Sequence, residues 1–194
     1  MLKYSRWLGV AGLVALLAGC AHSPQQLNVT PTVTTQLNQV AQRQPVVVTV
    51  QDSRSSPTLG TRGGLYPDSS NLTISPQAIP HLRQQVEQAV AQLGFQVVPQ
   101  GTPNANSLVV SLAELSYVSP KDSVYVTQAD IGATFAAEVR SLNQRYNGRY
   151  SASAQHRFGY APNQATNTRL VTEVMSDALS RIFRDPEVIR ILQQ

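Results

Sequence analysis

Residues 130–160 read DIGATFAAEVRSLNQRYNGRYSASAQHRFGY and carry the strongest fold signal in the chain. In the first part every second side chain is apolar: Ile131, Ala133, Phe135, Ala137 and Val139. The last part, from Tyr150 to Tyr160, repeats this alternation. Because successive side chains of a strand point to opposite faces of a sheet, both parts are predicted as strands with one buried face. Asn147-Gly148 lies between them and is a strong hairpin signal, so we expect an antiparallel pair that turns there.

Further strands are indicated upstream of this pair. Residues 46–50 (VVVTV) follow Pro45 and form a short β-branched run, which is typical of a buried central strand. Residues 107–113 (SLVVSLA) form a second apolar run, and residues 96–98 form a short third one. The sequence therefore predicts three strands upstream of the alternating pair.

Two segments have helical periodicity. Apolar residues recur at spacings of three and four over residues 79–93, and Gly94 follows as a C-cap. A second apolar stripe covers residues 170–183, after which Asp185-Pro186 begins a last short helix. The predicted order is β-α-β-β-β-β-α. We expect an α+β fold, a two-layer sandwich of a mainly antiparallel sheet with two helices.

The N-terminus has the pattern of a bacterial lipoprotein signal peptide. Lys3 and Arg6 precede an uncharged apolar run over residues 7–18, which is too short to span a bilayer. The run ends in the lipobox-like sequence Leu17, Ala18, Gly19 and Cys20. Small residues before the cysteine suit a signal peptidase that must reach the backbone, and the pattern implies a diacylglyceryl thioether on Cys20, with palmitate among the acyl chains. Two or three acyl chains hold a protein durably at a membrane.

This anchor defines the expected organisation of the chain. Residues 1–19 are the signal peptide, residues 20–45 a lipidated N-terminus with an extended polar tether, and residues 46–194 a single periplasmic α+β domain. Cys20 is the only cysteine, so the domain has no disulfide in an oxidising compartment. The residue after the cysteine is Ala21, and a residue other than aspartate at this position resembles the sorting pattern for the outer membrane.

Charge gives no sign of a nucleic-acid partner. Without Lys3 and Arg6 the chain holds 13 basic residues against 11 acidic ones. Its arginines are scattered along the chain, whereas nucleic-acid binders concentrate basic residues on one face or arm.

The long segment after the first strand, residues 52–68, is expected to be a loop and contains the candidate contact residues. Asp52 and Arg54 are two positions apart at a strand end and can pair with each other or frame a loop mouth. Arg62 lies among glycines and could offer a guanidinium to an anionic group. A local salt bridge and a contact to a ligand or partner both remain open at this point.

Motifs for catalysis are absent from the sequence. It has no H-E-x-x-H, no G-x-S-x-G, no P-loop and no cysteine pair for a metal. The three histidines, His22, His81 and His156, are isolated from one another. Asp130 and Glu138 share a strand face but are too far apart for paired acid–base chemistry. We therefore expect no enzymatic activity, no metal and no cofactor.

The chain resembles the YajG family of lipoproteins. The resemblance rests on the lipobox, residues 28–31, residues 46–54, Gly60-Thr-Arg62, the helix ending at Gly94-Phe95 and the C-terminal helix. It covers nearly the whole mature chain and implies a small lipoprotein of the Gram-negative envelope. The family has no established catalytic activity, so no catalytic residue is carried over.

Three functions follow as hypotheses. The first is a non-enzymatic module that is anchored to the outer membrane, faces the periplasm and binds another envelope protein. The second is a binder of peptidoglycan or another glycan, through Arg62 and the tyrosines. The third is a hydrolase whose site is assembled from residues distant in sequence.

Overall fold

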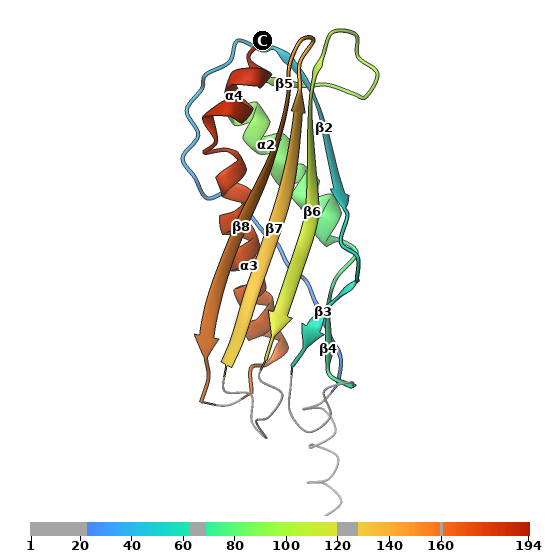
Figure 1. Cartoon of the computed structure of the whole chain (residues 1–194), viewed down its shortest axis with the longest axis vertical. Coiled ribbons are helices and arrows are strands. Elements are labelled where there is room, and N and C mark those ends of the chain that lie inside the picture. Colours follow the sequence, from blue (N-terminus) through green and yellow to red (C-terminus); the bar gives the residue numbers. More distant parts are fainter. Residues whose placement is uncertain (1–22, 63–68, 120–127, 160) are drawn as a thin grey trace, which may run out of the picture.

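The computed structural model describes residues 23–62, 69–119, 128–159 and 161–194. This part of the chain forms two layers, a mixed β-sheet and three helices that lie behind it in the view of Figure 1. The α+β two-layer architecture predicted from the sequence is confirmed. Small parts of the prediction differ, each for a physical reason.

The three longest strands are β6 (Asn106–Val118), β7 (Gln128–Arg140) and β8 (Arg145–Arg157). Each has 13 residues, which corresponds to roughly 43 Å at the usual strand rise. They pair antiparallel in sequence order. Within the described chain β8 pairs only with β7 and therefore forms one edge of the sheet.

The turn between β7 and β8 is not where the sequence predicted it. It lies at residues 141–144, where the Ser141 N–H donates to the Gln144 carbonyl oxygen at 2.9 Å. The predicted turn residues, Asn147-Gly148, lie inside β8. A Cβ at position 148 would strike the ring and hydroxyl of Tyr150. Gly148 therefore makes room for a tyrosine and does not mark a turn.

The other edge of β6 is shared by two strands that run parallel to it. β2 (Pro45–Asp52) pairs with the first half of β6, and β3 (Thr58–Thr61) meets the second half at Tyr117. β5 (Gln96–Val97) pairs parallel with β2. The chain reaches β5 from β2 through a helix, and such a crossover brings strands back in parallel. The sheet is therefore mixed and not mainly antiparallel.

The segment predicted as a long loop contains β3, which forms a hairpin with the strand that follows the loop. β3 pairs antiparallel with β4 (Asn71–Ile74), which in turn pairs parallel with β1 (Gln25–Leu27). The β3–β4 register shifts between Thr58 and Gly60. Gly60 has a φ of +151°, and a Cβ there would collide with the Tyr117 carbonyl. Strands this short and irregular lack an alternating pattern, which explains why they were not predicted.

The helices are α2 (Ala78–Gln92), α3 (Gln164–Ile182) and α4 (Pro186–Leu192). α3 is capped by Asn163, whose side chain accepts the Thr166 N–H at 2.8 Å. α4 is capped by Asp185 in the same way. Together with the facing side of the sheet they bury one core, whose largest fully buried side chains are Tyr117, Phe135, Leu27, Leu72, Leu82, Leu93, Leu108, Leu112, Ile131, Leu170, Met175 and Leu179. No helix in the described ranges is both long and apolar enough to cross a membrane.

An extended strap, residues 28–36, runs along α3. The N–H groups of Thr30, Thr32 and Thr34 donate to the hydroxyls of Thr172, Ser176 and Ser180, at 3.3, 3.0 and 2.9 Å. Four residues of a helix rise about 6.0 Å and two residues of an extended chain about 6.6 Å, so the two repeats match. Side-chain hydroxyls of α3 thus accept the strap N–H groups, as the carbonyl groups of a neighbouring strand would.

The strap changes the expected domain boundary. Residues 20–45 were predicted as an extended tether, and the strap is indeed extended. However, Leu27, Val29 and Ala41 are buried in the core, and the Ala41 N–H donates to the Leu93 carbonyl at 3.0 Å. The folded body therefore begins by Gln25, and few residues separate it from Cys20.

Candidate functional site

The face of β2, β6, β7 and β8 opposite the helices is not covered by any described element, and we call it the uncovered face (Figure 1). The strand registers place one set of alternating residues side by side on it. Its centre holds small and hydroxyl-bearing side chains, namely Thr49, Ser107, Ser111, Ser116, Gly132, Thr134, Ser151 and Ser153, together with the apolar Val47, Val109 and Ala136. A face of mixed small, polar and apolar residues suits contact with a broad surface.

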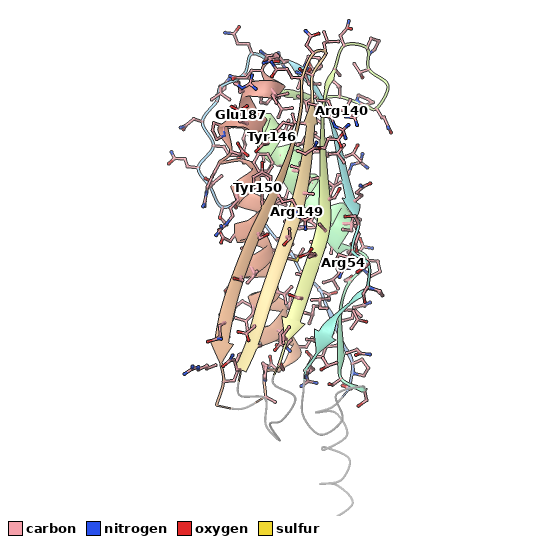
Figure 2. All side chains as sticks on the ribbon, viewed as in Figure 1. Arg54, Arg140, Tyr146, Arg149, Tyr150 and Glu187 are labelled. Atoms are coloured by element: carbon pink, nitrogen blue, oxygen red, sulfur yellow. The ribbon has the colours of Figure 1, made fainter. Side chains whose placement is uncertain are left out.

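Ion pairs flank this centre. Glu138 accepts hydrogen bonds from Arg140 and, at 2.8 Å, from Arg145. Glu114 accepts from Arg149 at 3.0 Å. Figure 2 shows Arg140 and Arg149 on the long strands. The side chains of Arg145 and Arg149 are 56% and 61% exposed, and exposed pairs of this kind contribute only about 0–1 kcal/mol. These arginines can therefore exchange partners at low cost.

A hollow of about 350 Å³ interrupts the uncovered face. Its lining includes the small residues Ser116, Gly132, Thr134, Ser151 and Ser153 of the sheet and two charged residues, Glu114 of β6 and Arg181 of α3. Gly132 sets its depth, because a Cβ at this position would come within 3.0 Å of the Ser116 hydroxyl. The hollow can receive one protruding side chain of a partner.

Asp52 and Arg54, the first two predicted contact residues, pair with each other. Arg54 donates from Nε to Oδ1 at 2.9 Å and from Nη2 to Oδ2 at 2.7 Å. The hydrogen bonds from Arg54 hold the pKa of Asp52 below its usual value, although burial acts to raise it. The Arg54 side chain is only 6% exposed. The geometry is that of a local salt bridge, which orders the end of β2.

Arg62, the third predicted residue, lies elsewhere and is 6% exposed. Its guanidinium donates to the carbonyl oxygens of Ser23 at 3.3 Å and Pro162 at 3.4 Å. Burial lowers the pKa of Arg62. Its Nε has no hydrogen-bond partner among the described residues. The structure therefore does not join Arg62 to the Asp52–Arg54 pair, and it gives Arg62 the role of closing the sheet end near the N-terminus.

A buried polar chain lies beside Arg62. The Tyr117 hydroxyl donates to Asn167 at 2.9 Å, and the Asn167 amide donates to the Gln25 side-chain oxygen at 2.8 Å. Burial raises the pKa of Tyr117 to about 12, while the charge of Arg62 acts to lower it. These contacts join β6, α3 and β1, so they hold the two layers and the N-terminal strand together.

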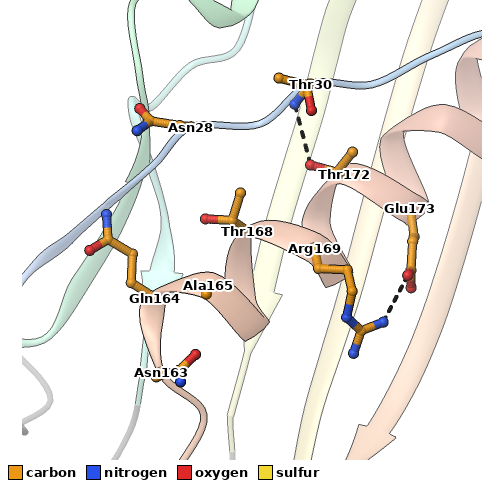
Figure 3. A pocket seen from close by; sticks show the side chains of 9 residues that line it. All are labelled: Asn28, Thr30, Asn163, Gln164, Ala165, Thr168, Arg169, Thr172 and Glu173. Carbon is orange, nitrogen blue, oxygen red and sulfur yellow. Dashed lines mark hydrogen bonds and ion pairs between the residues drawn. The ribbon is translucent and has the colours of Figure 1, made fainter.

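A hollow of about 820 Å³ on the helical side lies between the strap and the first turns of α3 (Figure 3). Asn28, Thr30, Gln164 and Thr168 line it with neutral amides and hydroxyls. Its two charged residues, Arg169 and Glu173, pair with each other at 2.7 Å. We call this the strap groove. It offers hydrogen bonds to a neutral polar ligand and brings no nucleophile beside a base.

Sequence reasoning missed one cluster entirely. Tyr146 and Tyr150 of β8 both donate to Oδ2 of Asp185, at 2.8 and 2.6 Å. Burial, followed by the hydrogen bond to Asp185, raises the pKa of Tyr150. Two tyrosines four residues apart on one strand face, with a capping aspartate downstream, were the available signal.

The remaining sequence-predicted groups stay isolated from one another. His81 Nε2 lies 3.1 Å from the Pro31 carbonyl oxygen, and His156 stacks on Phe158. In the described ranges no three His, Cys, Asp or Glu side chains gather as metal ligands would. The lipobox residues Leu17, Ala18, Gly19 and Cys20 lie outside the described residues.

The fold is similar to those of two solved structures. The chain is similar to a protein from Xanthomonas campestris, with a TM-score of 0.52 and 11% identity over 83% of this chain and 92% of that one. It is also similar to the rare lipoprotein B from Shewanella oneidensis, with a TM-score of 0.50 and 9% identity over 75% of this chain and 96% of that one. Likeness at this level of identity concerns the fold alone.

The sequence itself also matches a family. No curated protein of assigned function matches the chain. Residues 31–193, which extend from the strap to the last helix, match a family described as uncharacterized lipoprotein. The chain belongs to this family of lipoproteins.

Proposed function

We propose that this protein is a lipoprotein of the Gram-negative outer membrane whose non-enzymatic domain binds another envelope protein on its uncovered face. Membership of a lipoprotein family supports the anchor. The lipobox, Ala21 and the resemblance to YajG lipoproteins support the finer assignment to the outer membrane with the domain in the periplasm.

The uncovered face is the observation that carries the proposal. An antiparallel sheet commonly leaves one face solvated and polar, and in this protein the centre of that face is built mostly of small residues and is hollowed over Gly132. Exchangeable arginine–glutamate pairs surround that centre. Protein interfaces are depleted of charged residues at the centre and polar at the rim, and the ion pairs that border this face match that distribution.

The position of the anchor leaves this face accessible. Arg62 fixes Ser23 at one end of the sheet, and Ser141 contacts Gln194 at the other end. Cys20 precedes Ser23 by three residues, which span at most about 11 Å. The acyl chains therefore hold one end of the body close to the bilayer, and the strands extend away from it with the uncovered face open at the side.

Metabolic labelling tests the anchor. A Cys20→Ala variant should lose radiolabelled palmitate and appear in the soluble fraction. A Ser23→Ala variant should keep the label, because it leaves Cys20 and the lipobox unchanged. Label retained on the Cys20→Ala protein would contradict the anchor.

Site-specific crosslinking in cells tests the docking face. A photoreactive amino acid at Ser111 or Ser116 should give a discrete adduct with one envelope protein. The same amino acid at Gln88, an exposed position of α2 on the other side of the molecule, serves as the control. Adducts of equal yield from both sides, or none from the uncovered face, would argue against the proposal.

The strap groove supports a second candidate function, the binding of peptidoglycan glycan. Its neutral amide and hydroxyl lining resembles surfaces that hydrogen-bond sugar hydroxyls, although it contains no aromatic platform. The detergent-solubilised lipoprotein should then sediment with purified sacculi, and a Thr168→Arg variant, which fills the groove, should not. Equal sedimentation of both proteins, or of neither, would remove this candidate.

A further inference from the structure

In the part of the chain that the structure describes, one side of the β8 backbone is unpaired. The hydrogen bond from the Ser141 N–H to Gln144 makes these residues a bonded pair of the hairpin. Bonded and non-bonded pairs alternate along an antiparallel ladder. The even-numbered residues of β8 therefore bond to β7, and the N–H and C=O groups of the odd-numbered residues point away from the sheet. These outward groups belong to Arg145, Asn147, Arg149, Ser151, Ser153, Gln155 and Arg157.

This edge lacks most of the devices that usually protect an exposed strand. Proline, bulges, short length and charged side chains ordinarily keep edge strands from pairing with other chains, and of these β8 has only charged side chains, toward its two ends. β8 contains no proline, its 13 residues pair with β7 without a register shift, and no charged residue occurs from Tyr150 to Gln155. The edge is thus long, regular and uncharged at its centre.

We propose that β8 receives an extended strand that carries acidic side chains and belongs to the envelope partner, so that the sheet continues into that protein. This inference rests on the proposed function and names the chemistry of its partner. Strand addition supplies main-chain hydrogen bonds for affinity, and the alternating side chains determine specificity.

Charge complementarity identifies the occupant. β8 holds Arg145, Arg149 and Arg157 and no aspartate or glutamate. All three arginines are at odd positions, so they flank the open edge on the uncovered face. Arg157 has no ion-pair partner among the described residues, whereas Arg145 pairs with the partly exposed Glu138 and Arg149 with the exposed Glu114. Carboxylates at alternate positions of an incoming strand would lie opposite these guanidinium groups.

A second copy of this chain fits the edge poorly. In an antiparallel pair of two β8 strands, no register places a carboxylate opposite an arginine, because β8 has none. Registers centred on Arg149, Ser151 or Ser153 place two arginines directly opposite each other. Like charges in such cross-strand positions are destabilising, which favours a different protein as the partner.

Two synthetic peptides test the inference on the detergent-solubilised, full-length lipoprotein. The first is a fluorescein-labelled nonapeptide of alternating threonine and glutamate, and the second has lysine in place of each glutamate. Fluorescence polarisation should show that the glutamate peptide binds at least about tenfold more tightly than the lysine peptide. Salt at 0.5 M should weaken the binding of the glutamate peptide.

Matched variants locate the binding on the edge. Ser153→Pro removes an outward N–H without breaking the ladder with β7 and should abolish binding, whereas Ser153→Ala keeps the N–H and should bind normally. Arg157→Glu should weaken binding of the glutamate peptide and strengthen binding of the lysine peptide. The charge variant keeps the test decisive if the proline variant unfolds, which circular dichroism will reveal.

Two results would overturn the inference. One is equal binding of the two peptides, and the other is normal binding of the glutamate peptide to a folded Ser153→Pro protein. If neither peptide binds the protein while crosslinks from Ser116 persist in cells, the partner docks on the uncovered face without adding a strand. In that case the strand addition is wrong and the proposed function stands.

Discussion

Tyr150 fastens the edge strand to the last helix through a hydrogen bond of 2.6 Å from its hydroxyl to Oδ2 of Asp185. The other carboxylate oxygen of Asp185 accepts the Glu187 N–H at 2.9 Å and caps α4. Burial acts to raise the pKa of Asp185, but the hydrogen bonds from Tyr150 and Tyr146 lower it below the usual value. One carboxylate therefore holds both β8 and α4.

Removing this hydroxyl should destabilise the fold. We expect Tyr150→Phe to lower the free energy of unfolding by about 1–2 kcal/mol, because a charged acceptor loses a buried donor. Urea titration followed by circular dichroism measures the change. Tyr146→Phe serves as the comparison. We expect it to lower the free energy of unfolding by less, because the Tyr146 hydroxyl is less buried. A Tyr150→Phe protein as stable as the wild type would contradict this role of Asp185.

Gly148 should prove to be coupled to Tyr150. Gly148→Ala places a methyl group where the tyrosine ring lies, so the ring must move and its hydrogen bond must weaken. We expect the two substitutions Gly148→Ala and Tyr150→Phe to be non-additive in a double-mutant cycle, by about 0.5–1 kcal/mol or more. Additive losses would show that Gly148 is needed for some other reason.

Alkaline pH should weaken the fold through Tyr117. Its pKa is about 12 in the folded protein, against 10 for an unburied tyrosine. Below pH 10 both states are protonated and the stability is fully present. Between pH 10 and 12 the unfolded state releases its proton first, so stability falls as pH rises. Tyr117→Phe should reduce this fall, as measured by chemical denaturation at successive pH values. An unchanged pH dependence in the variant would contradict the assignment.

The hydroxyl ladder between α3 and the strap should be visible in hydrogen exchange. Ser176→Ala removes the acceptor of the Thr32 N–H, and loss of about 1 kcal/mol corresponds to roughly fivefold faster exchange there. Thr168→Ala on the same helix is the control, because no strap N–H donates to Thr168 in the described chain. Equal exchange at Thr32 in both variants would mean that the strap is held by apolar packing alone.

The sequence predicted those parts of the fold that depend on local periodicity. The alternation around Phe135 and Ala152 placed two long strands and their buried faces correctly. It did not place the turn, because Asn147-Gly148 has a tertiary role. It also did not predict the parallel pairing of β2 with β6, because that register follows from a crossover and not from any local pattern.

The strap was beyond prediction for a different reason. Its threonines, asparagines and glutamines have the composition of a linker. What orders it is a set of hydroxyls more than 140 residues later in the chain. Of the candidate contacts, the Asp52–Arg54 salt bridge could be anticipated from its spacing. The contacts of Arg62 could not, because Ser23 and Pro162 come from distant segments.

The strap also determines how mechanical force enters the molecule. Tension on the acyl chains would pass through Gln25 into a segment that lies alongside α3 and is bonded to it at several points. Such bonds are loaded in shear, so they resist together and do not open one after another. Drag on a bound partner would therefore reach the bilayer through the last long helix, without first unravelling the beginning of the chain.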